Sequence, residues 1–270
     1  MYGWCVIDRN EILRLYDEQE RRNSIQPPYH REELPGIVRH VHPDRARLSF
    51  VIYSDLTAEN ADHTIQDQID WYRTQINGGG LEWKTFEHDE PPDLPQRLAA
   101  HGFEAEEQEA LLYLDLQNCP DVYLQPLTAD VRRITDPEDV GPVVAVQTAV
   151  YDRNFDWLDK QLRASLSTYA GNWAVYVAYV DDLPVCAAWM SLPANSQFAG
   201  LWGGATLPQY RRMGIYTAVV AARAQEAIRR GYRFLTVDAG DMSRPILQKR
   251  GFQLLVHTTP YALKPPQNGS

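Results

Sequence analysis

The chain has 270 residues, of which 44% are apolar and 11% aromatic, enough for one large globular domain or two of ordinary size. Its formal net charge of -10 argues against nucleic acid or an anionic membrane as the main partner, because both bind basic surfaces. The cysteines Cys5, Cys119 and Cys186 form no CxxC pair, which favours a reducing, cytoplasmic location and offers neither a disulfide framework nor a zinc site.

The first half of the chain predicts helices that alternate with strands. Helical spacing of apolar side chains over 10–22 precedes a proline-containing stretch up to Gly36 that we expect to be a loop. The other elements expected here are two strands within 36–56, a helix from about Asn60 to the glycines at 78–80, a strand at 81–87, a short helix at 92–101 and a strand at 110–116. The N-terminal stretch turns charged at Asp8, and no apolar run approaches the roughly 20 residues that span a bilayer, so neither a signal peptide nor an anchor is expected.

Two prolines and little periodicity over 117–127 indicate a domain boundary near 117–125, so we divide the chain into residues 1–120 and 121–270. Asp181 and Asp182 suit a tight hairpin turn in the second half. Its expected elements are a strand at 130–135, helices at 137–151 and 157–166, strands at 173–180, 183–192 and 198–206, a helix at 214–230, a strand at 233–239, a helix at 243–250 and a strand at 254–263.

The last thirds of the two halves resemble each other. Both run from a helix end through Gly, a strand, an acidic turn and a Pro-containing helix to a Gly-Phe pair, which indicates an internal repeat. The "NGGG" at 77–80 follows its helix and is interpreted as a flexible C-cap instead of a phosphate loop.

Arg211 and Arg212 lie at the expected start of the helix at 214–230. The first turn of a helix carries unpaired N–H groups and the positive end of the peptide dipole, so positive side chains are disfavoured there. A bound anion would remove this conflict. The alternative is that both arginines point into solvent and Gly214 only relieves a tight turn. The matching stretch of the first half, "TAENADH", is acidic and lacks glycine, so only the second half is expected to bind an anion.

The ordered series of strand, "QYRRMG", long helix, strand and "AGDMSRPILQKRGF" resembles the GNAT superfamily of acyl-CoA-dependent N-acetyltransferases over roughly residues 122–263. The resemblance implies an α+β protein of two GNAT-like units, each with a mixed, mainly antiparallel sheet flanked by helices, the first a degenerate copy. Its most specific part is the family's loop, Gln/Arg-x-x-Gly-x-Gly/Ala, matched by Arg211, Arg212, Met213, Gly214, Ile215 and Tyr216.

The resemblance implies that this loop holds the pyrophosphate of coenzyme A, that acetyl-CoA is the cosubstrate and that no metal takes part. Tyr216 departs from the small residue of the family at the last position, which puts close backbone approach there in doubt. The strand at 201–206 would pair with the pantetheine arm where it splays from 234–238. The small residues that admit the arm are Gly203, Gly204 and Ala205, followed by Thr206. The alternative is a glycine bulge in an ordinary sheet.

Acetyl transfer to an amine requires a neutral nucleophile and therefore a general base or a water chain. The family often uses a Glu on the strand before the loop, but no residue of 198–207 is ionisable. Asp238 and Asp241 are the best remaining carboxylates, although either could instead cap backbone N–H groups.

The departing thiolate needs a proton, which the family often takes from a Tyr four residues before the Gly-Phe pair. Leu247 occupies that position here, so Ser243, Tyr216 or a water replaces the usual acid, or the protein is not a transferase. Tyr151, Asp152 and Trp157 would lie over the acceptor cleft in related folds, or else form a helix end with an aromatic plug.

His40 and His42 alternate on one strand, as in some metal sites, but without an identifiable third ligand they are expected to be surface residues of a hairpin.

The sequence thus predicts an acetyl-CoA-dependent N-acetyltransferase that acts on an amine, with a cationic small molecule as the easiest acceptor to attract. A homodimer is one possible assembly. The alternative function is a non-catalytic acyl-CoA-binding module whose first unit docks a partner or a second copy of the chain, which Leu247 and the missing strand carboxylate favour.

Overall fold

A computed structural model of the chain describes residues 7–76 and 79–263. By its internal contacts the chain divides into two compact units. The first consists of the residues up to Leu111, Ala239–Arg244 and the residues from Leu254 onward, and the second consists of Leu112–Asp238 and Pro245–Gln253.

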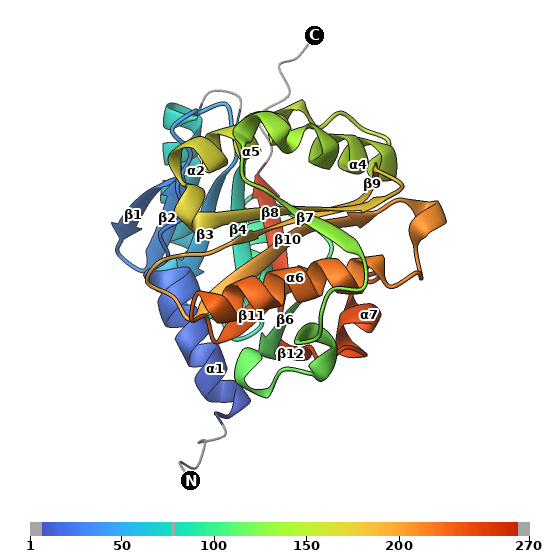
Figure 1. The fold of residues 1–270 in the computed structure, drawn as a ribbon. Helices are drawn as coiled ribbons and strands as arrows, with labels where there is room; N and C mark the ends of the chain where they lie inside the picture. The colour runs from blue at the N-terminus through green and yellow to red at the C-terminus, as the bar shows by residue number, and fades with distance from the viewer. Residues whose placement is uncertain (1–6, 77–78, 264–270) are drawn as a thin grey trace. The chain divides into compact units, whose positions relative to one another are not determined.

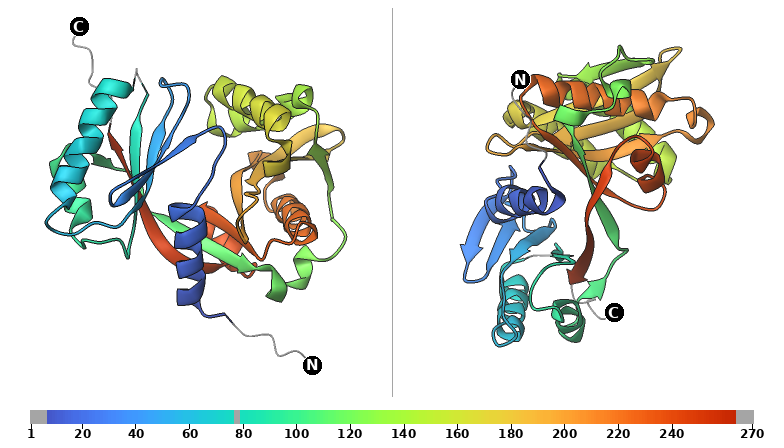
Figure 2. Two further views of the ribbon diagram at one scale, coloured as in Figure 1. Left: turned by 90° about the vertical axis from the view of Figure 1, so that its left-hand side faces the viewer. Right: turned by 90° about the horizontal axis from the view of Figure 1, so that it is seen from below.

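The first unit combines a mixed sheet with helices on both faces. Its strands follow the order β1-β2-β3-β4-β12, with β5 also paired to β12. Figure 2 shows α2 and α3 on one side of this sheet and α1 on the other. The elements are α1 (Arg9–Tyr16) with a π-helical continuation (Asp17–Arg22), β1 (His30–Leu34), β2 (Ile37–Val41), β3 (Ser49–Ser54), α2 (Ala61–Gln75), β4 (Leu81–Phe86), α3 (Leu94–Ala100), β5 (Glu104–Ala105), the start of β6 (Glu109–Asp115) and β12 (Gln253–Leu263).

The second unit has the strand order β6-β11-β10-β9-β8-β7. Helices α4 and α5 cover one face of strands β8 to β10, and α6 covers the other (Figure 1). The elements are β7 (Asp130–Ile134), α4 (Gly141–Tyr151), α5 (Asp156–Thr168), β8 (Trp173–Val180), β9 (Leu183–Ser191), β10 (Phe198–Thr206), α6 (Ile215–Arg229), β11 (Phe234–Ala239) and α7 (Arg244–Gln248). Short 3₁₀ turns lie at Leu116–Asn118, Asp121–Tyr123, Pro137–Val140, Ala170–Asn172 and Pro208–Tyr210.

Each unit buries its own apolar core, as the periodic apolar residues require. In the first unit, Ile65 and Ile69 of α2 pack with Leu98 of α3 over Trp83 of β4. In the second, the apolar stripes of α4 and α5 pack over the face of the sheet that carries Trp189.

The predicted internal repeat has a structural counterpart in each unit. Strands β3 and β4 pair in parallel across α2, and strands β10 and β11 pair in parallel across α6. Both repeats end in a glycine with positive φ, Gly102 at 91° and Gly251 at 96°. The following phenylalanine then donates its backbone N–H to a buried leucine, Leu98 or Leu247. The two halves therefore share the same local construction.

Most predicted elements lie within a few residues of their expected positions, but β1 was not predicted. It is a charged strand, "HREEL", that pairs with β2 around Gly36, whose φ is 77°. Charged residues are common on exposed strands at sheet edges, where they give no apolar alternation to detect. The asparagine and first glycine of the predicted "NGGG" C-cap lie outside the described residues.

The last strand of the chain completes the sheet of the first unit. Strand β12 runs antiparallel to β4, from Thr258 opposite Phe86 to Leu263 opposite Leu81. The division by contacts therefore assigns this strand to the first unit, whereas the boundary expected from the sequence was a single point near residue 120.

Candidate functional site

Strands β10 and β11 pair only at their beginnings. The parallel ladder runs from Phe198 opposite Phe234 to Gly200 opposite Thr236. Strand β10 continues to Thr206 and β11 to Ala239 without further pairing between them. The two strands therefore diverge toward their carboxyl ends, as the family resemblance implies, and this leaves main-chain groups of β10 able to pair with an extended ligand.

A β-bulge interrupts β10 at the opening between the two strands. The antiparallel register with β9 shifts between Trp202 and Ala205, so that Gly203 and Gly204 together lie opposite one residue of β9. Gly203 has a φ of 60°, and a Cβ built on it would lie 2.0 Å from Cζ3 and 2.1 Å from Cη2 of Trp189. Only glycine fits this position without movement of Trp189.

The loop after β10 leads into α6 through a left-handed turn. Arg212 has a φ of 63° and Gly214, the N-cap of α6, a φ of 81°. Gly214 provides no side chain to cap the first N–H groups, and a Cβ at this position would have no neighbour within 4 Å. These N–H groups thus face an open approach beside the exposed Arg211 and Arg212. Arg211 also donates from Nε to the carbonyl oxygen of Thr206 at 3.1 Å, which ties the loop to the end of β10.

The departure at Tyr216 has a structural explanation. Its aromatic ring lies against Gly204 of β10, where a Cβ would come within 2.8 Å of Cε2 and 3.3 Å of the hydroxyl. The large side chain of Tyr216 therefore occupies space that is free because residue 204 is glycine. Met213 is 62% exposed, whereas Ile215 is buried and anchors the first turn of α6.

A buried arginine lies on the face of α6 that contacts the sheet. Arg223 is 1% exposed and donates to the carbonyl oxygens of Val219 at 3.3 Å and Trp189 at 3.2 Å. Complete burial lowers the pKa of this guanidinium. Burial also raises the pKa of the Tyr216 hydroxyl, an effect that the nearby charge of Arg223 opposes. Tyr216 therefore carries its proton at neutral pH.

The predicted catalytic residues fall into both units. Asp238 lies in the second unit, on the part of β11 that no longer pairs with β10. Asp241 and Ser243 fall in the segment Ala239–Arg244, which groups with the first unit. Asp241 is exposed, and the Ser243 hydroxyl donates to the carbonyl oxygen of Gly240 at 3.3 Å. Leu247 is 1% exposed, so its side chain is a core residue of α7.

Three aromatic rings lie where α4 gives way to α5: Tyr151 ends α4, Phe155 lies in the linker and Trp157 lies in the first turn of α5. Tyr151 and Trp157 are 47% and 46% exposed, and each has its ring centroid 5.9 Å from that of the buried Phe155. Arg153 places its guanidinium carbon 4.7 Å from the centre of the Phe155 ring. Asp152 ends α4 in a left-handed conformation with a φ of 50°.

A family model described as an acetyltransferase (GNAT) domain matches residues 125–243. This chain contains a GNAT acetyltransferase domain. The resemblance inferred from the loop, the long helix and the order of the strands is thereby confirmed. The match covers β7 to β11 and ends just before α7.

Solved structures with the same fold extend the likeness over both units. A GCN5-related N-acetyltransferase from Kribbella flavida has a TM-score of 0.67 at 15% identity and covers 88% of this chain and 90% of its own. A conserved protein of unknown function from Staphylococcus epidermidis has a TM-score of 0.66 at 13% identity, with 89% of this chain and 96% of its own covered. A tandem GNAT protein from the clavulanic acid biosynthesis pathway has a TM-score of 0.57 at 10% identity, with 91% and 86% covered.

At these identities the solved structures show the fold alone, and they confirm the predicted α+β class of GNAT-like architecture. No match is found among the curated proteins. Within the described residues, none of the helices combines the length and apolar character needed to cross a bilayer. A search of the same residues for three or more grouped metal-ligating side chains also finds none.

The prediction that His40 and His42 are surface residues is wrong. His40 is 0% and His42 8% exposed, and the ring of Tyr29 packs against both. His40 donates from Nε2 to the carbonyl oxygen of Ser24 at 3.1 Å. Burial lowers the pKa of His40 to about 4, so the ring is neutral at physiological pH. The stretch after His42 folds back on it, since the backbone N–H of Asp44 donates to its Nδ1.

The first unit differs from the GNAT domain at the matching helix start. Its α2 follows Thr57–Asn60, where the Asn60 side chain accepts the backbone N–H of Thr57 at 2.8 Å. The exposed Glu59 carboxylate hydrogen bonds to Thr57 and to its own backbone, which lowers its pKa. A negative charge thus lies at the place where the GNAT domain presents two arginines.

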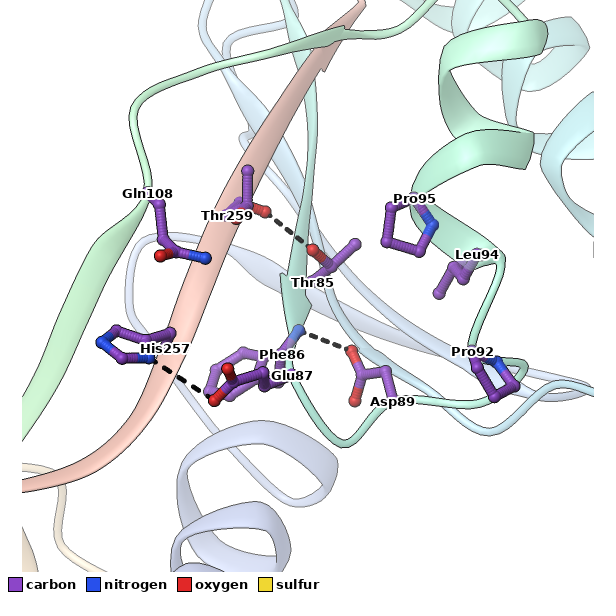
Figure 3. Close-up of a pocket in the computed structure, with 10 residues that line it drawn as sticks. All are labelled: Thr85, Phe86, Glu87, Asp89, Pro92, Leu94, Pro95, Gln108, His257 and Thr259. Atoms are coloured by element: carbon purple, nitrogen blue, oxygen red, sulfur yellow. Dashed lines mark hydrogen bonds and ion pairs between the residues drawn. The ribbon is translucent and has the colours of Figure 1, made fainter.

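The first unit also contains a pocket of about 180 Å³ beside the end of β4 (Figure 3). Thr85 donates to the carbonyl oxygen of Thr259 at 3.0 Å, and His257 lies 3.5 Å from the Glu87 carboxylate. The buried Asp89 carboxylate accepts two bonds from the Arg21 guanidinium, at 2.7 and 2.9 Å. None of the residues predicted from the sequence as site residues lines this pocket.

Sequence reasoning missed Gln147, a buried glutamine of α4 that hydrogen bonds to the bulge of β10. The signal available was a single amide on the inward stripe of α4 that also contains Val143 and Val146. A buried amide requires a hydrogen-bond partner, but the sequence does not say which one.

Proposed function

We propose that the GNAT domain transfers an acetyl group from acetyl-CoA directly to an amine within a ternary complex. The observation that carries this proposal is the divergence of β10 from β11 next to a helix start that has an open glycine N-cap. Backbone N–H groups at such a helix start bind phosphate oxygens without a metal. The acidic helix start in the first unit supports the proposal that residues 1–120 are a degenerate copy without a cofactor site.

The loop residues would hold the pyrophosphate, with Arg211 and Arg212 as charged partners and the N–H groups from Met213 to Tyr216 as donors. The bulged strand, with Gly203, Gly204, Ala205 and Thr206, would hold the pantetheine arm through its main chain. Small residues in this stretch favour close approach of an amide-bearing ligand. The side chain of Tyr216 fits beside Gly204, so it leaves the loop itself open.

The chemistry requires a base for the amine and a proton for the departing thiolate. We propose Asp238 as the base because it lies on the part of β11 that no longer pairs with β10. Asp241 and Ser243 remain proposed catalytic groups. Ser243 would supply the proton that the family takes from a Tyr at the position of Leu247. In the reaction the carbon–sulfur bond breaks, the carbon–nitrogen bond forms, and the amine proton passes to the base.

The acceptor proposed is a small-molecule amine, since the net charge of -10 favours cations. The exposed rings of Tyr151, at the end of α4, and Trp157, at the start of α5, provide apolar surface for the non-reacting part of such an acceptor. We propose a cytoplasmic location, no nucleic-acid or membrane partner and, as one possible assembly, a homodimer.

A non-catalytic acyl-CoA-binding module is the second candidate. The observation that favours it is the burial of Leu247, which leaves no acid at the position that the family uses. Release of free thiol from acetyl-CoA separates the two functions. A transferase releases thiol slowly alone and faster with a pool of amines, whereas a module binds acetyl-CoA tightly and releases none.

Calorimetric titration with acetyl-CoA, dephospho-CoA and adenosine tests the proposed loop. We expect binding that survives loss of the 3'-phosphate and is lost with the pyrophosphate. The double variant Arg211→Glu, Gly214→Val should bind at least tenfold more weakly. Lys249→Glu with Gly171→Val is the matched control, because both are exposed positions of the second unit outside the loop. Equal affinity of the two double variants would refute the pyrophosphate assignment.

A further inference from the structure

Gln147 is a buried amide in an apolar environment. It is 2% exposed, and its neighbours on the inward stripe of α4, Val143 and Val146, are 0% and 1% exposed. A buried amide lowers stability unless it is hydrogen bonded. Its Nε2 donates to the carbonyl oxygen of Gly203, at the centre of the β10 bulge. The glutamine therefore connects α4 to the one irregular peptide of the strand that opens toward the proposed ligand.

This hydrogen bond fixes the direction of the next N–H group. In a trans peptide the carbonyl oxygen of one residue and the N–H of the following residue point in opposite directions. The carbonyl of Gly203 is turned toward α4 by Gln147, so the N–H of Gly204 points away from α4. Gly204 lies beyond Gly200, the last residue of β10 that pairs with β11.

The bulge needs an external contact to keep this orientation. Two successive glycines allow their shared peptide plane to rotate at little steric cost. The ring of Trp189 restricts what can replace Gly203, but the ring atoms nearest to it are the carbons Cζ3, Cη2 and Cε3, which form no strong hydrogen bond with the peptide. The amide of Gln147 does form a hydrogen bond to this peptide, and it is held in place among the buried residues of α4, which include Val143 and Val146.

We propose that Gln147 is a positioning residue for acyl transfer: by holding the Gly203 carbonyl, it orients the Gly204 N–H as a donor to the carbonyl oxygen of the bound acyl group. This inference rests on the proposed function, because it requires acetyl-CoA to lie between the diverging strands. A fixed donor stabilises the negative charge that develops on the acyl oxygen when the amine attacks, and needs no reorganisation at that moment.

The test measures the polarisation of the bound thioester directly. Infrared difference spectra of acetyl-CoA labelled with ¹³C at the acetyl carbonyl report how strongly a donor polarises that carbonyl. We expect a shift to lower frequency on binding to the unaltered protein, and loss of this shift in Gln147→Met, which keeps the volume but not the donor. Thr148→Ala, an exposed change on the same helix, is the matched control and should keep the shift.

A second variant separates positioning from packing. Gln147→Glu retains the shape of the side chain, but as a carboxylate it has no donor for the Gly203 carbonyl, whereas the protonated acid does. The carbonyl shift should therefore be lost at pH 8 and return at pH 5.5 in this variant, while it stays constant in the unaltered protein. A purely structural role predicts no such reversal. This variant also keeps the proposal testable should Gln147→Met not fold.

Gln147→Met should also lower turnover without a comparable loss of affinity for acetyl-CoA. Thiol release by Gln147→Met should fall at least tenfold, while its dissociation constant for acetyl-CoA stays within threefold. An identical carbonyl frequency in the unaltered protein and in Gln147→Met would overturn the inference and leave the proposed function standing. Failure of the unaltered protein to bind acetyl-CoA would overturn both.

Discussion

The fit between Gly203 and Trp189 makes Gly203→Ala the sharpest test of the bulge. Alanine at a φ of 60° costs roughly 1–2 kcal/mol relative to glycine. Its Cβ would also lie 2.0 Å from a ring carbon of Trp189, far inside the ordinary contact of about 3.5–4.0 Å, so the ring or the strand must move. Overpacking of this kind adds about 1–3 kcal/mol, which brings the expected loss of unfolding free energy to about 2–5 kcal/mol.

Thermal melting of Gly203→Ala against Gly171→Ala measures this effect. Gly171 is exposed, its φ is not positive, and a Cβ there has no neighbour within 4 Å, so its replacement should leave the melting temperature nearly unchanged. For a chain of this size each kcal/mol corresponds to about 2–4 °C, so Gly203→Ala should melt roughly 4–20 °C lower. Adding Trp189→Leu should recover the overlap part of the loss and leave the backbone part. Equal melting temperatures of the two alanine variants would refute the reasoning.

Three further predictions concern charge. His40 has a pKa lowered to about 4 in the folded protein, against about 6.5 in the unfolded chain, so its neutral ring contributes fully to the free energy of unfolding above pH 6.5. This contribution is lost as the pH falls from 6.5 to 4, and the loss reaches about 3 kcal/mol. His40→Gln should therefore flatten the dependence of the free energy of unfolding, measured in urea, on pH over this range, and parallel curves for the variant and the unaltered protein would contradict the prediction. Asp89→Ala removes one of the two carboxylates that pair with Arg21, and Asp17 remains as the other. Because the Asp89 and Arg21 side chains are only 4% and 3% exposed, the loss should be about 1.5–3 kcal/mol in a urea melt, compared with less than about 1 kcal/mol for Arg14→Ala in an exposed pair. Asp238→Asn should lower turnover at least tenfold with little change in acetyl-CoA affinity, and equal turnover would show that Asp238 is not the base.

Local sequence patterns predicted most of the helices and strands. Apolar spacing predicted α2, α4, α5 and α6, and the strands of both units followed from short apolar runs between turn residues. The loop motif and the order of strands and helices predicted the GNAT architecture through their resemblance to that family. The repeated Gly-Phe ends, whose glycines both have positive φ, predicted the internal repeat.

The features that the sequence did not predict depend on contacts between distant residues. Gln147 meets Gly203 only because α4 packs over β10, and the burial of His40 depends on Tyr29 and Ser24 from a stretch read as a loop. The partner of β12 could not be predicted either, since an alternating strand has the same pattern whichever neighbour it joins.

The membership of β12 in the first unit bears on how the chain folds during synthesis. The first 111 residues leave the ribosome early, yet β4 then still lacks its antiparallel neighbour. An open strand edge of this kind readily pairs with other chains. The second unit can complete its sheet of β6 to β11 before β12 has been synthesised and paired with β4. The second unit can therefore complete its sheet before the first unit, although the first unit is translated first.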